Sequence, residues 1–371
     1  MKKSLGILCA ALMLFVLAGF ALAVGGEAGD PLISLNFLNN DFLAQTEEKI
    51  DAGIQADDNA LLTDATSRWN GAVASAQAVV NASYVPTWTE ARVKQGDILS
   101  GFTGLQVLPL TGELRVDFDS GAVVDVTDGT EVPSGSMLKS NHRYLVAEET
   151  TAVFTAVSKT AVINYCGTYH FHLSKTPDYN AMARALKSLS LFRGTTTAYG
   201  EGFDLENVPN RIESLIMLIR MLGEEEAALA CTAPHPFIDV PSWCEPYVAY
   251  AYEKGYSNGV GADIFGTYME SVPVIYVEFM LRALGLSSTA TTDISDALVR
   301  AHAAGVLTAG ECTHLETTKF LRSDVVYLSY YALQAEGNSM LPLYRSLAER
   351  GVFTLADYTA AQNLVGTERI S

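Results

Sequence analysis

Apolar residues recur at helical spacing in three similar stretches of the second half of the chain. Each stretch has a first helix, a glycine-bounded turn, a loop and a second helix whose apolar residues lie three or four positions apart. That spacing places them on one helix face. The three stripes are Ile212/Leu215/Ile216/Ile219, Tyr276/Phe279/Met280/Ala283 and Val325/Leu328/Ser329/Ala332. Because no stripe can be buried alone, the pattern predicts three helical repeats around one shared core, with pseudo-threefold symmetry.

The predicted repeat domain covers residues 175–335, with repeats at about 175–229, 234–286 and 291–335. Two further short helices are expected at residues 339–350 and 355–364. We expect residues 336–371 to pack against the repeats as a C-terminal helical cover.

The apolar period changes between residues 96 and 174. Short runs of apolar and β-branched residues are separated there by turn signals such as Thr111-Gly112 and Asp128-Gly129. The runs, taken as strands, span residues 107–110, 113–118, 122–126, 143–146, 152–157 and 161–165. Strands this short and closely spaced predict a small antiparallel β-domain, either a sandwich or a barrel.

Histidine and cysteine positions give no strong metal signal. Cys166, His170 and His172 fall on one face of the strand that ends the β-domain, but a lone His-x-His pair is more often structural, and no acid completes a site. Cys231 and Cys244 are close enough to pair in an oxidising exterior, although nothing in their spacing requires it. We expect buried thiols rather than a disulfide or a zinc site.

Before the β-domain, apolar positions from residue 41 to residue 80 recur at steps of three, four and seven residues among many polar ones. This predicts one long or broken amphipathic helix in an N-terminal segment, residues 24–95, that ends in a polar stretch after Pro86. The thin stripe favours packing on the protein itself, with self-association through a coiled coil as the alternative. The predicted fold class is therefore α+β and multidomain.

The first 23 residues have the features of a secretory signal peptide. Lys2 and Lys3 precede an apolar run from Leu5 to Leu22, and small residues precede Val24. The run is shorter than a typical membrane-spanning helix, and no cysteine follows it as a lipid anchor. We expect an exported protein with no membrane insertion after cleavage.

The charge balance limits the class of partner. The formal net charge is −18 and the isoelectric point is about 4.7. Nucleic acids and anionic membrane surfaces are bound by clustered Lys and Arg, so neither is an expected partner. An anionic polymer would have to be held by a few positioned cations rather than by the overall field.

The repeats resemble the S-layer homology repeats of bacterial cell-surface proteins. The resemblance spans roughly residues 178–333 and rests on three features: a Phe-Ile-Asp-Val segment at residues 237–240 followed by Trp243, the glycine-bounded turns, and the start of the second helix. That start is Asn210-Arg211-Ile212-Glu213 in the first repeat and Leu321-Arg322-Ser323-Asp324 in the third. The middle repeat has Val272-Pro273-Val274-Ile275, with neither arginine nor acid, and is expected to be inactive.

The resemblance implies binding of a wall polysaccharide that carries pyruvate ketals, with the motif arginine holding the carboxylate. It makes Arg211 and Arg322 candidate polysaccharide ligands and Trp243 a candidate wall for sugar stacking. Asn210, Glu213 and Asp324 are the helix-capping candidates of the motif.

The residues themselves point the same way. An arginine at a helix start, beside free N–H groups, is a local anion receptor suited to a planar carboxylate. Taken singly, such an arginine is more often only solvated. A capping residue more often only stabilises its helix, and a tryptophan more often only packs in the core. Two equivalent arginines favour function.

The predicted function is that of an exported, non-catalytic surface protein. The repeats would hold it non-covalently on secondary wall polysaccharide linked to peptidoglycan, in the cell wall or S-layer of a Gram-positive-type bacterium. No cofactor or metal is expected, and no G-x-S-x-G, H-E-x-x-H or phosphate-loop motif is present, although abundant Asp and Glu leave a glycosidase-type pair open.

The alternative is a carbohydrate- or ligand-binding β-domain, with degenerate repeats as scaffold. A groove beside Arg211 and Arg322 would favour the first function, and a deep polar cleft on the β-domain the second.

Overall fold

The computed structural model of the protein describes residues 42–371, apart from residues 81–82, 198–199, 289 and 291. The predicted signal peptide lies outside the described residues. Among the described helices, none has the length and apolar character needed to cross a membrane. The chain divides into two units, one ending at Val79 and the other beginning at Val80.

The described part of the first unit is helix α2 (Leu43–Val80), which continues one residue past the boundary. The long helix predicted from the sequence is confirmed, and it is unbroken. Its larger apolar side chains are exposed, among them Ile50, Ile54, Leu61 and Trp69. No other described element of its own unit covers them, so the predicted packing of this stripe is not seen within that unit. Local helix propensity, with alanine as the commonest residue, favours the helix there.

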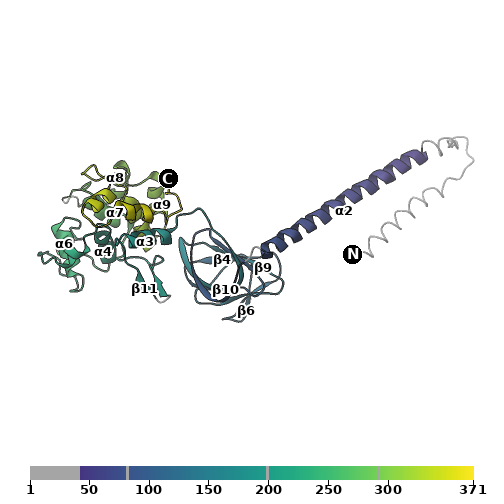
Figure 1. Cartoon of the computed structure of the whole chain (residues 1–371), viewed down its shortest axis with the longest axis horizontal. Helices are drawn as coiled ribbons and strands as arrows, with labels where there is room; N and C mark the ends of the chain where they lie inside the picture. The colour runs from purple at the N-terminus through teal and green to yellow at the C-terminus, as the bar shows by residue number, and fades with distance from the viewer. Residues whose placement is uncertain (1–41, 81–82, 198–199, 289, 291) are drawn as a thin grey trace, which may run out of the picture. The chain divides into compact units, whose positions relative to one another are not determined.

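The second unit begins with a ten-stranded sheet in which the described neighbours pair antiparallel. The strand order is β6-β5-β8-β3-β10-β2-β9-β4-β7, with β1 paired to β10. Figure 1 shows the sheet curving round on itself. The strands are β1 (Ser83–Lys94), β2 (Ile98–Phe102), β3 (Gln106–Thr111), β4 (Leu114–Asp117), β5 (Ala122–Asp125), β6 (Thr130–Val132), β7 (Ser136–Met137), β8 (Tyr144–Ala147), β9 (Thr151–Ala156) and β10 (Thr160–His172). The predicted antiparallel β-structure and the α+β class are thus confirmed.

Alternation along the strands gives the sheet its buried face. In β4, Leu114 and Val116 are buried, whereas Arg115 between them is exposed. Inward side chains of the neighbouring strands, such as Phe154 of β9, belong to the same apolar core. Burying each such side chain stabilises the fold by about 1.5–3 kcal/mol. The curved sheet therefore encloses packed side chains, as small β-barrels do.

Strand β1 lies in residues that the sequence analysis assigned to the N-terminal segment. The boundary predicted at residues 95–96 therefore moves to Ser83. Pro86 does not separate a helix from a polar stretch; it lies where the β1–β10 register shifts, between Val85 and Thr89. A residue without an N–H group is tolerated at such an irregularity. The short strands β2, β6 and β7 were also not predicted.

The remainder of the second unit is mainly helical. Its described helices are α3 (Tyr179–Ser188), α4 (Arg211–Met221), α5 (Glu225–Leu229), α6 (Glu245–Glu253), α7 (Pro273–Ala283), α8 (Ala297–Ala303), α9 (Ala309–Thr317), α10 (Arg322–Ala332), α11 (Leu343–Glu349) and α12 (Leu355–Gln362). A small hairpin, β11 (Thr195–Thr197) and β12 (Gly200–Gly202), lies between α3 and α4. The hairpin, α5 and α9 were not predicted, whereas the first and second helices of the three predicted repeats are present.

The second helices of the three predicted repeats meet one another. Helix α4 contacts both α7 and α10, and the Tyr276 hydroxyl of α7 lies 2.6 Å from the Ser329 hydroxyl of α10. In addition, α4 contacts α6, α7 contacts α8, and α10 contacts α3. Each second helix thus packs on the first helix of the following repeat, and the third closes on the first.

A buried ion pair joins the β-domain to the helices. The Lys159 ammonium, in the turn between β9 and β10, lies 2.7 Å and 2.8 Å from the two carboxylate oxygens of Asp324 on α10. It also donates to the Lys319 carbonyl at 2.8 Å, while Asp324 accepts from the Leu321 N–H at 2.7 Å and lies 3.1 Å from His314 Nε2. The side chains of the pair are 9% and 2% exposed. Burial lowers the pKa of Lys159, and the attraction of Asp324 opposes that effect.

Replacing Asp324 with Ala is expected to destabilise the second unit by about 3–5 kcal/mol, because Lys159 then stays buried without its counter-charge. Urea unfolding followed by circular dichroism measures the loss. In a Lys159→Met background the same replacement should cost less, since no buried charge is left unpaired. Asp117→Ala, which breaks an exposed pair with Arg115, is the control and should change stability by about 1 kcal/mol or less. An equal loss from Asp324→Ala in both backgrounds would contradict the role of the pair.

Candidate functional site

Helix α4 begins at Arg211, and its start has the predicted capping box. Asn210 Oδ1 accepts a hydrogen bond from the Glu213 N–H at 2.9 Å, and Glu213 Oε2 accepts one from the Asn210 N–H at 2.9 Å. The capping roles predicted for Asn210 and Glu213 are therefore confirmed. The box fixes the backbone of the first turn, and with it the direction in which the Arg211 side chain leaves the helix.

The N–H groups beside Arg211 are not free, contrary to the prediction from sequence. The Arg211 N–H donates to the Met269 carbonyl at 2.8 Å, and the Ile212 N–H donates to the Thr267 carbonyl at 3.2 Å. The loop before α7 thus satisfies donors that a helix N-terminus otherwise offers to an anion. Anion binding at this place depends on the guanidinium.

The Arg211 guanidinium is buried at the edge of a cavity of about 390 Å³. Arg211 is 3% exposed, and one terminal nitrogen donates to Ser257 Oγ at 3.0 Å and to the Gly259 carbonyl at 3.3 Å. The rings of Phe265 and Phe279 lie 5.2 Å and 4.9 Å from the guanidinium carbon. Arg211 Nε has no hydrogen-bond partner, and no described carboxylate forms an ion pair with this side chain.

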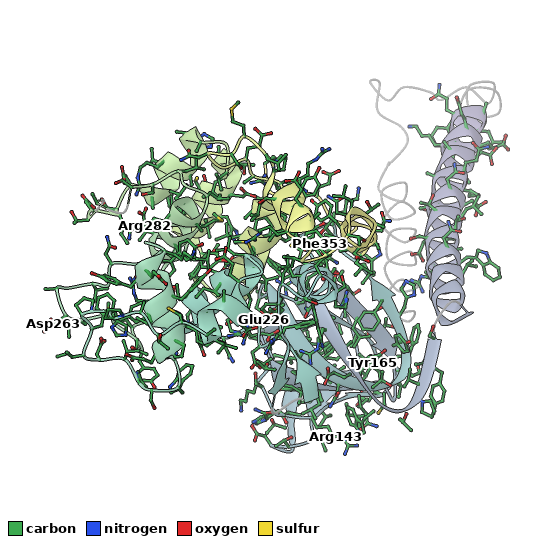
Figure 2. The ribbon with its side chains drawn as sticks, turned by 60° about the vertical axis from the view of Figure 1, so that its left-hand side comes forward. Arg143, Tyr165, Glu226, Asp263, Arg282 and Phe353 are labelled. Atoms are coloured by element: carbon green, nitrogen blue, oxygen red, sulfur yellow. The ribbon has the colours of Figure 1, made fainter. Side chains whose placement is uncertain are left out.

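Helix α7 brings a second guanidinium and one carboxylate to the same cavity. Arg282, labelled in Figure 2, and Glu278 both line it. Glu278 is 2% exposed, and its carboxylate accepts from Arg282 at 2.8 Å and from Arg300 at 2.7 Å. Since two cations already bind Glu278, this carboxylate does not neutralise Arg211. The cavity keeps an excess of positive charge.

The Arg211 guanidinium stays charged although its surroundings disfavour the charge. Burial and the nearby charge of Arg282 lower the pKa of Arg211 to about 10, so the guanidinium remains protonated at neutral pH. An unpaired buried cation costs several kcal/mol, and each aromatic ring offsets about 0.5–2 kcal/mol of that cost. A bound carboxylate would offset the rest, since a guanidinium can hold both of its oxygens at once.

Only glycine fits at position 259, which lines the same cavity. Gly259 has a φ of +77°, and a Cβ at this position would lie 2.4 Å from the Phe237 ring. Gly259 therefore lets the turn bring its carbonyl to Arg211 without a steric clash. Asp239 forms hydrogen bonds in the same region.

Asp239, the acid of the Phe-Ile-Asp-Val segment, fixes the ring that packs on Arg211. Its carboxylate accepts from the N–H groups of Phe265 at 2.7 Å and Gly266 at 2.8 Å, and its carbonyl accepts from the Thr267 hydroxyl at 2.9 Å. These bonds position Phe265 and also the Thr267 carbonyl that receives the N–H of Ile212. The segment thus connects the first half of the middle repeat to the start of α4.

Arg322 begins α10, as predicted, in similar backbone surroundings. The Arg322 N–H donates to the Asn207 carbonyl at 2.9 Å, and the Ser323 N–H donates to the Leu205 carbonyl at 3.0 Å. As at Arg211, a loop of the following repeat satisfies the first N–H groups. The predicted cap is present in part, because Asp324 accepts from the Leu321 N–H while Leu321 itself has no side-chain acceptor.

The Arg322 side chain differs from that of Arg211. It is half-buried, and its Nε donates only weakly to the Phe203 carbonyl, at 3.4 Å. Burial lowers the pKa of Arg322, and the charges of Glu213 and Asp204 oppose this. Arg322 is not among the residues that line the Arg211 cavity. The structure therefore places the two arginines at separate sites.

Trp243, the predicted sugar-stacking residue, is 55% exposed and lies just before α6. Its Nε1 donates to the Tyr268 hydroxyl at 3.4 Å, and Tyr268 is exposed as well. Trp243 does not line the Arg211 cavity. The two aromatic residues form an exposed pair of their own.

Sequence reasoning missed most of the groups that surround Arg211. Ser257 and Gly259 belong to a turn that the sequence marks only as a turn, and Phe279 and Arg282 belong to the stripe and end of a helix. One sequence signal could have identified these groups. In a ring of repeats, an arginine at the start of a second helix is expected to face the glycine turn of the next repeat.

Two further groups of titratable residues lie in the β-domain. Asp125, Asp128 and His142 have ligand atoms within 4.8 Å of one another. However, Asp125 already lies 2.9 Å from His142 Nδ1, and the Lys139 ammonium lies 2.6 Å from Asp128. Burial raises the pKa of Asp125, but its hydrogen bonds to His142 and to backbone N–H groups outweigh this and lower it. Asp125 and Asp128 therefore already have partners within the β-domain.

The predicted histidine pair lies on β10, where His170 and His172 are exposed while Cys166 is buried. The cysteines Cys166, Cys231, Cys244 and Cys312 are free thiols. Burial raises the pKa of Cys244 to about 11, as expected of a structural thiol.

Comparisons with known proteins give no assignment. No family model matches the chain, and no curated protein does. Among solved structures, part of the chain is similar to procruciferin, an 11S globulin from Brassica napus, at 13% identity and a TM-score of 0.16, over 23% of this chain and 22% of that one. It is also similar to NovW, a 4-keto-6-deoxy sugar epimerase from Streptomyces spheroides, at 18% identity and a TM-score of 0.16, over 24% of this chain and 51% of that one. Similarity at this level carries no argument about function.

Asp239→Asn is expected to destabilise the second unit by about 1–3 kcal/mol at neutral pH, because an amide has one acceptor oxygen where the carboxylate uses two. Burial alone would raise the pKa of Asp239, but the N–H groups of residues 265–267 lower it below 3.8. The stabilisation is therefore complete above about pH 4 and is lost as the pH falls through the lowered pKa.

The stability difference between wild type and Asp239→Asn, measured by urea unfolding, should shrink when the pH is lowered from 7 to about 3. Asp263→Asn is the matched control, since Asp263 is an exposed carboxylate of the same loop, labelled in Figure 2. A difference that does not depend on pH would contradict the role of the Asp239 charge.

Proposed function

We propose that this protein is an exported, non-catalytic surface protein whose helical domain binds an anionic, pyruvylated wall polysaccharide. The observation that carries the proposal is the Arg211 guanidinium. It is buried and protonated, its Nε has no partner, and it borders a cavity without an ion pair to any described carboxylate. A carboxylate ligand on a sugar supplies the planar anion that this group lacks.

The arrangement of the helices supports an S-layer-homology-like unit with pseudo-threefold symmetry. In each predicted repeat the second helix packs on the first helix of the next, and the start of α4 meets the middle repeat as the start of α10 meets the first. A site at each arginine is then formed by two repeats together. In this proposal Arg322 is a second, weaker site, because the residue is more exposed than Arg211 and has Glu213 and Asp204 nearby.

The third equivalent site of the proposed unit is occupied by Arg369 from the C-terminal end of the chain. Pro273 takes the place of the arginine at the start of α7. At the corresponding turn of the third repeat, Arg369 binds Glu311 at 2.6 Å and the Val306 carbonyl at 2.6 Å and lies 5.0 Å from the Tyr331 ring. Tyr331 holds in α10 the position of Arg282 in α7. The proposal therefore assigns at most two carboxylate sites to the domain.

The exposed pair Trp243 and Tyr268 is proposed as a stacking surface for sugar rings outside the cavity. Aromatic faces contact sugar rings through their apolar C–H groups and bury area at little entropic cost. The alternative, a ligand site inside the β-domain, has less support because buried apolar side chains such as Val107, Val146 and Phe154 fill the interior of the sheet.

Arg211→Met is expected to weaken co-sedimentation of the mature protein with Gram-positive sacculi by about tenfold or more, because a charge-assisted hydrogen-bonded pair contributes about 1.5–3 kcal/mol. Arg322→Met should weaken it less, and the double variant more than either. Methionine fills the volume of the arginine stem, so thermal unfolding should show no loss of stability.

Arg345→Met, which removes an exposed arginine of α11, is the matched control and should sediment like wild type. Sacculi stripped of their secondary polymer should not retain the protein. The proposed role of the arginines is wrong if the double variant sediments like wild type, and the proposed polymer is wrong if stripped sacculi still retain the protein.

A further inference from the structure

A second, larger cavity of the second unit lies where β1, α3 and the β11–β12 hairpin meet. It has a volume of about 1000 Å³ and shares no lining residue with the Arg211 cavity. Four of its lining residues are cations, namely Arg92 of β1, Arg184 and Lys187 of α3, and Arg193 of the following turn. No Asp or Glu lines it.

This concentration of positive charge is unusual for the chain, which has 24 Lys and Arg against 42 Asp and Glu. Four like charges around one cavity repel one another, and the repulsion is weakened only by solvent and by neighbouring acids. Two of the four have such a neighbour: Arg92 lies 2.9 Å from Glu90, and Arg193 lies 2.9 Å from Glu225.

The other two cations have no ion pair among the described residues. Lys187 places its ammonium 6.0 Å from the centre of the Phe203 ring, which is a weak cation–π contact. Arg184 is exposed on the next turn of the same face of α3. Both side chains can therefore turn toward a ligand without breaking an ion pair.

Arg92 is held in place more firmly than the others. Its side chain is 14% exposed, and it lies against the hairpin at Gly202, where a Cβ would approach its guanidinium to 2.5 Å. The guanidinium thus packs directly on the hairpin backbone at a residue that has no side chain. One mostly buried guanidinium and three further cations therefore line the same cavity.

We infer that this basic cleft binds an oligoanion, a ligand carrying two or more phosphate or carboxylate groups. The cations come from three elements and surround a volume far larger than one oxyanion needs, so a single carboxylate would leave most of them unused. The net charge of −18 repels anions at long range, and binding therefore requires several direct contacts at once. Arginine and lysine heads provide these contacts as charge-assisted hydrogen bonds.

The test uses two probes with the mature protein, inorganic triphosphate for the phosphate source and citrate for the carboxylate source. Isothermal titration calorimetry of the wild type should give saturable binding of at least one of them, and the better binder identifies the source. The variant Arg184→Ala/Lys187→Ala should lose affinity by about tenfold or more, since two charge-assisted contacts are removed. Both side chains are exposed, so the variant should unfold at the wild-type temperature.

The matched control is Lys254→Ala/Arg345→Ala, which removes the same number of exposed charges away from the cleft. It should bind the probes like wild type, as should Arg211→Met, which separates this site from the proposed wall-binding site. Saturable binding to neither probe would overturn the inference. So would an equal loss of affinity in the cleft variant and the control, because the effect would then come from net charge alone.

Discussion

Three short helices, α4, α7 and α10, bury their apolar faces against one another, and this shared burial is what stabilises each of them. Each is about three turns long, too short to be stable alone in water. Their packing gives the first residue of each helix a defined place beside the shared core. Arg211 and Arg322 owe their positions to this constraint, and so do the loop carbonyls that satisfy the first N–H groups of α4 and α10.

The protein treats two buried cations in different ways. The Lys159 ammonium contacts both carboxylate oxygens of the buried Asp324, which balances its charge. The pair connects the β-domain to α10. Arg211 has two aromatic rings, a hydroxyl and a carbonyl but no carboxylate. A paired buried charge is complete in itself, whereas an unpaired one beside a cavity gains free energy from a ligand of opposite charge. This contrast supports a structural role for Lys159 and a ligand-binding role for Arg211.

Because the chain as a whole is acidic, anion binding depends on the local cations of the two cation-lined cavities. A net charge of −18 repels anions near the surface, and physiological salt screens this repulsion beyond about 8–10 Å. Within a cavity, local cations and partial desolvation dominate instead. Selectivity for an anion would therefore depend on its fit to Arg211, or to the basic cleft around Arg92, and not on the charge of the whole protein.

The sequence alone determined the features that depend on near neighbours: the helical stripes, the Asn210–Glu213 capping box, the alternation of most strands, and the arginines at two helix starts. Periodicity reports which face of an element is buried, but not against what. The pairing of β1 with β10, the ion pair of Lys159 with a residue 165 positions away, and the ring of Phe279 on Arg211 were decided only by the tertiary structure. Such contacts depend on loop paths and helix crossings, which no local pattern encodes.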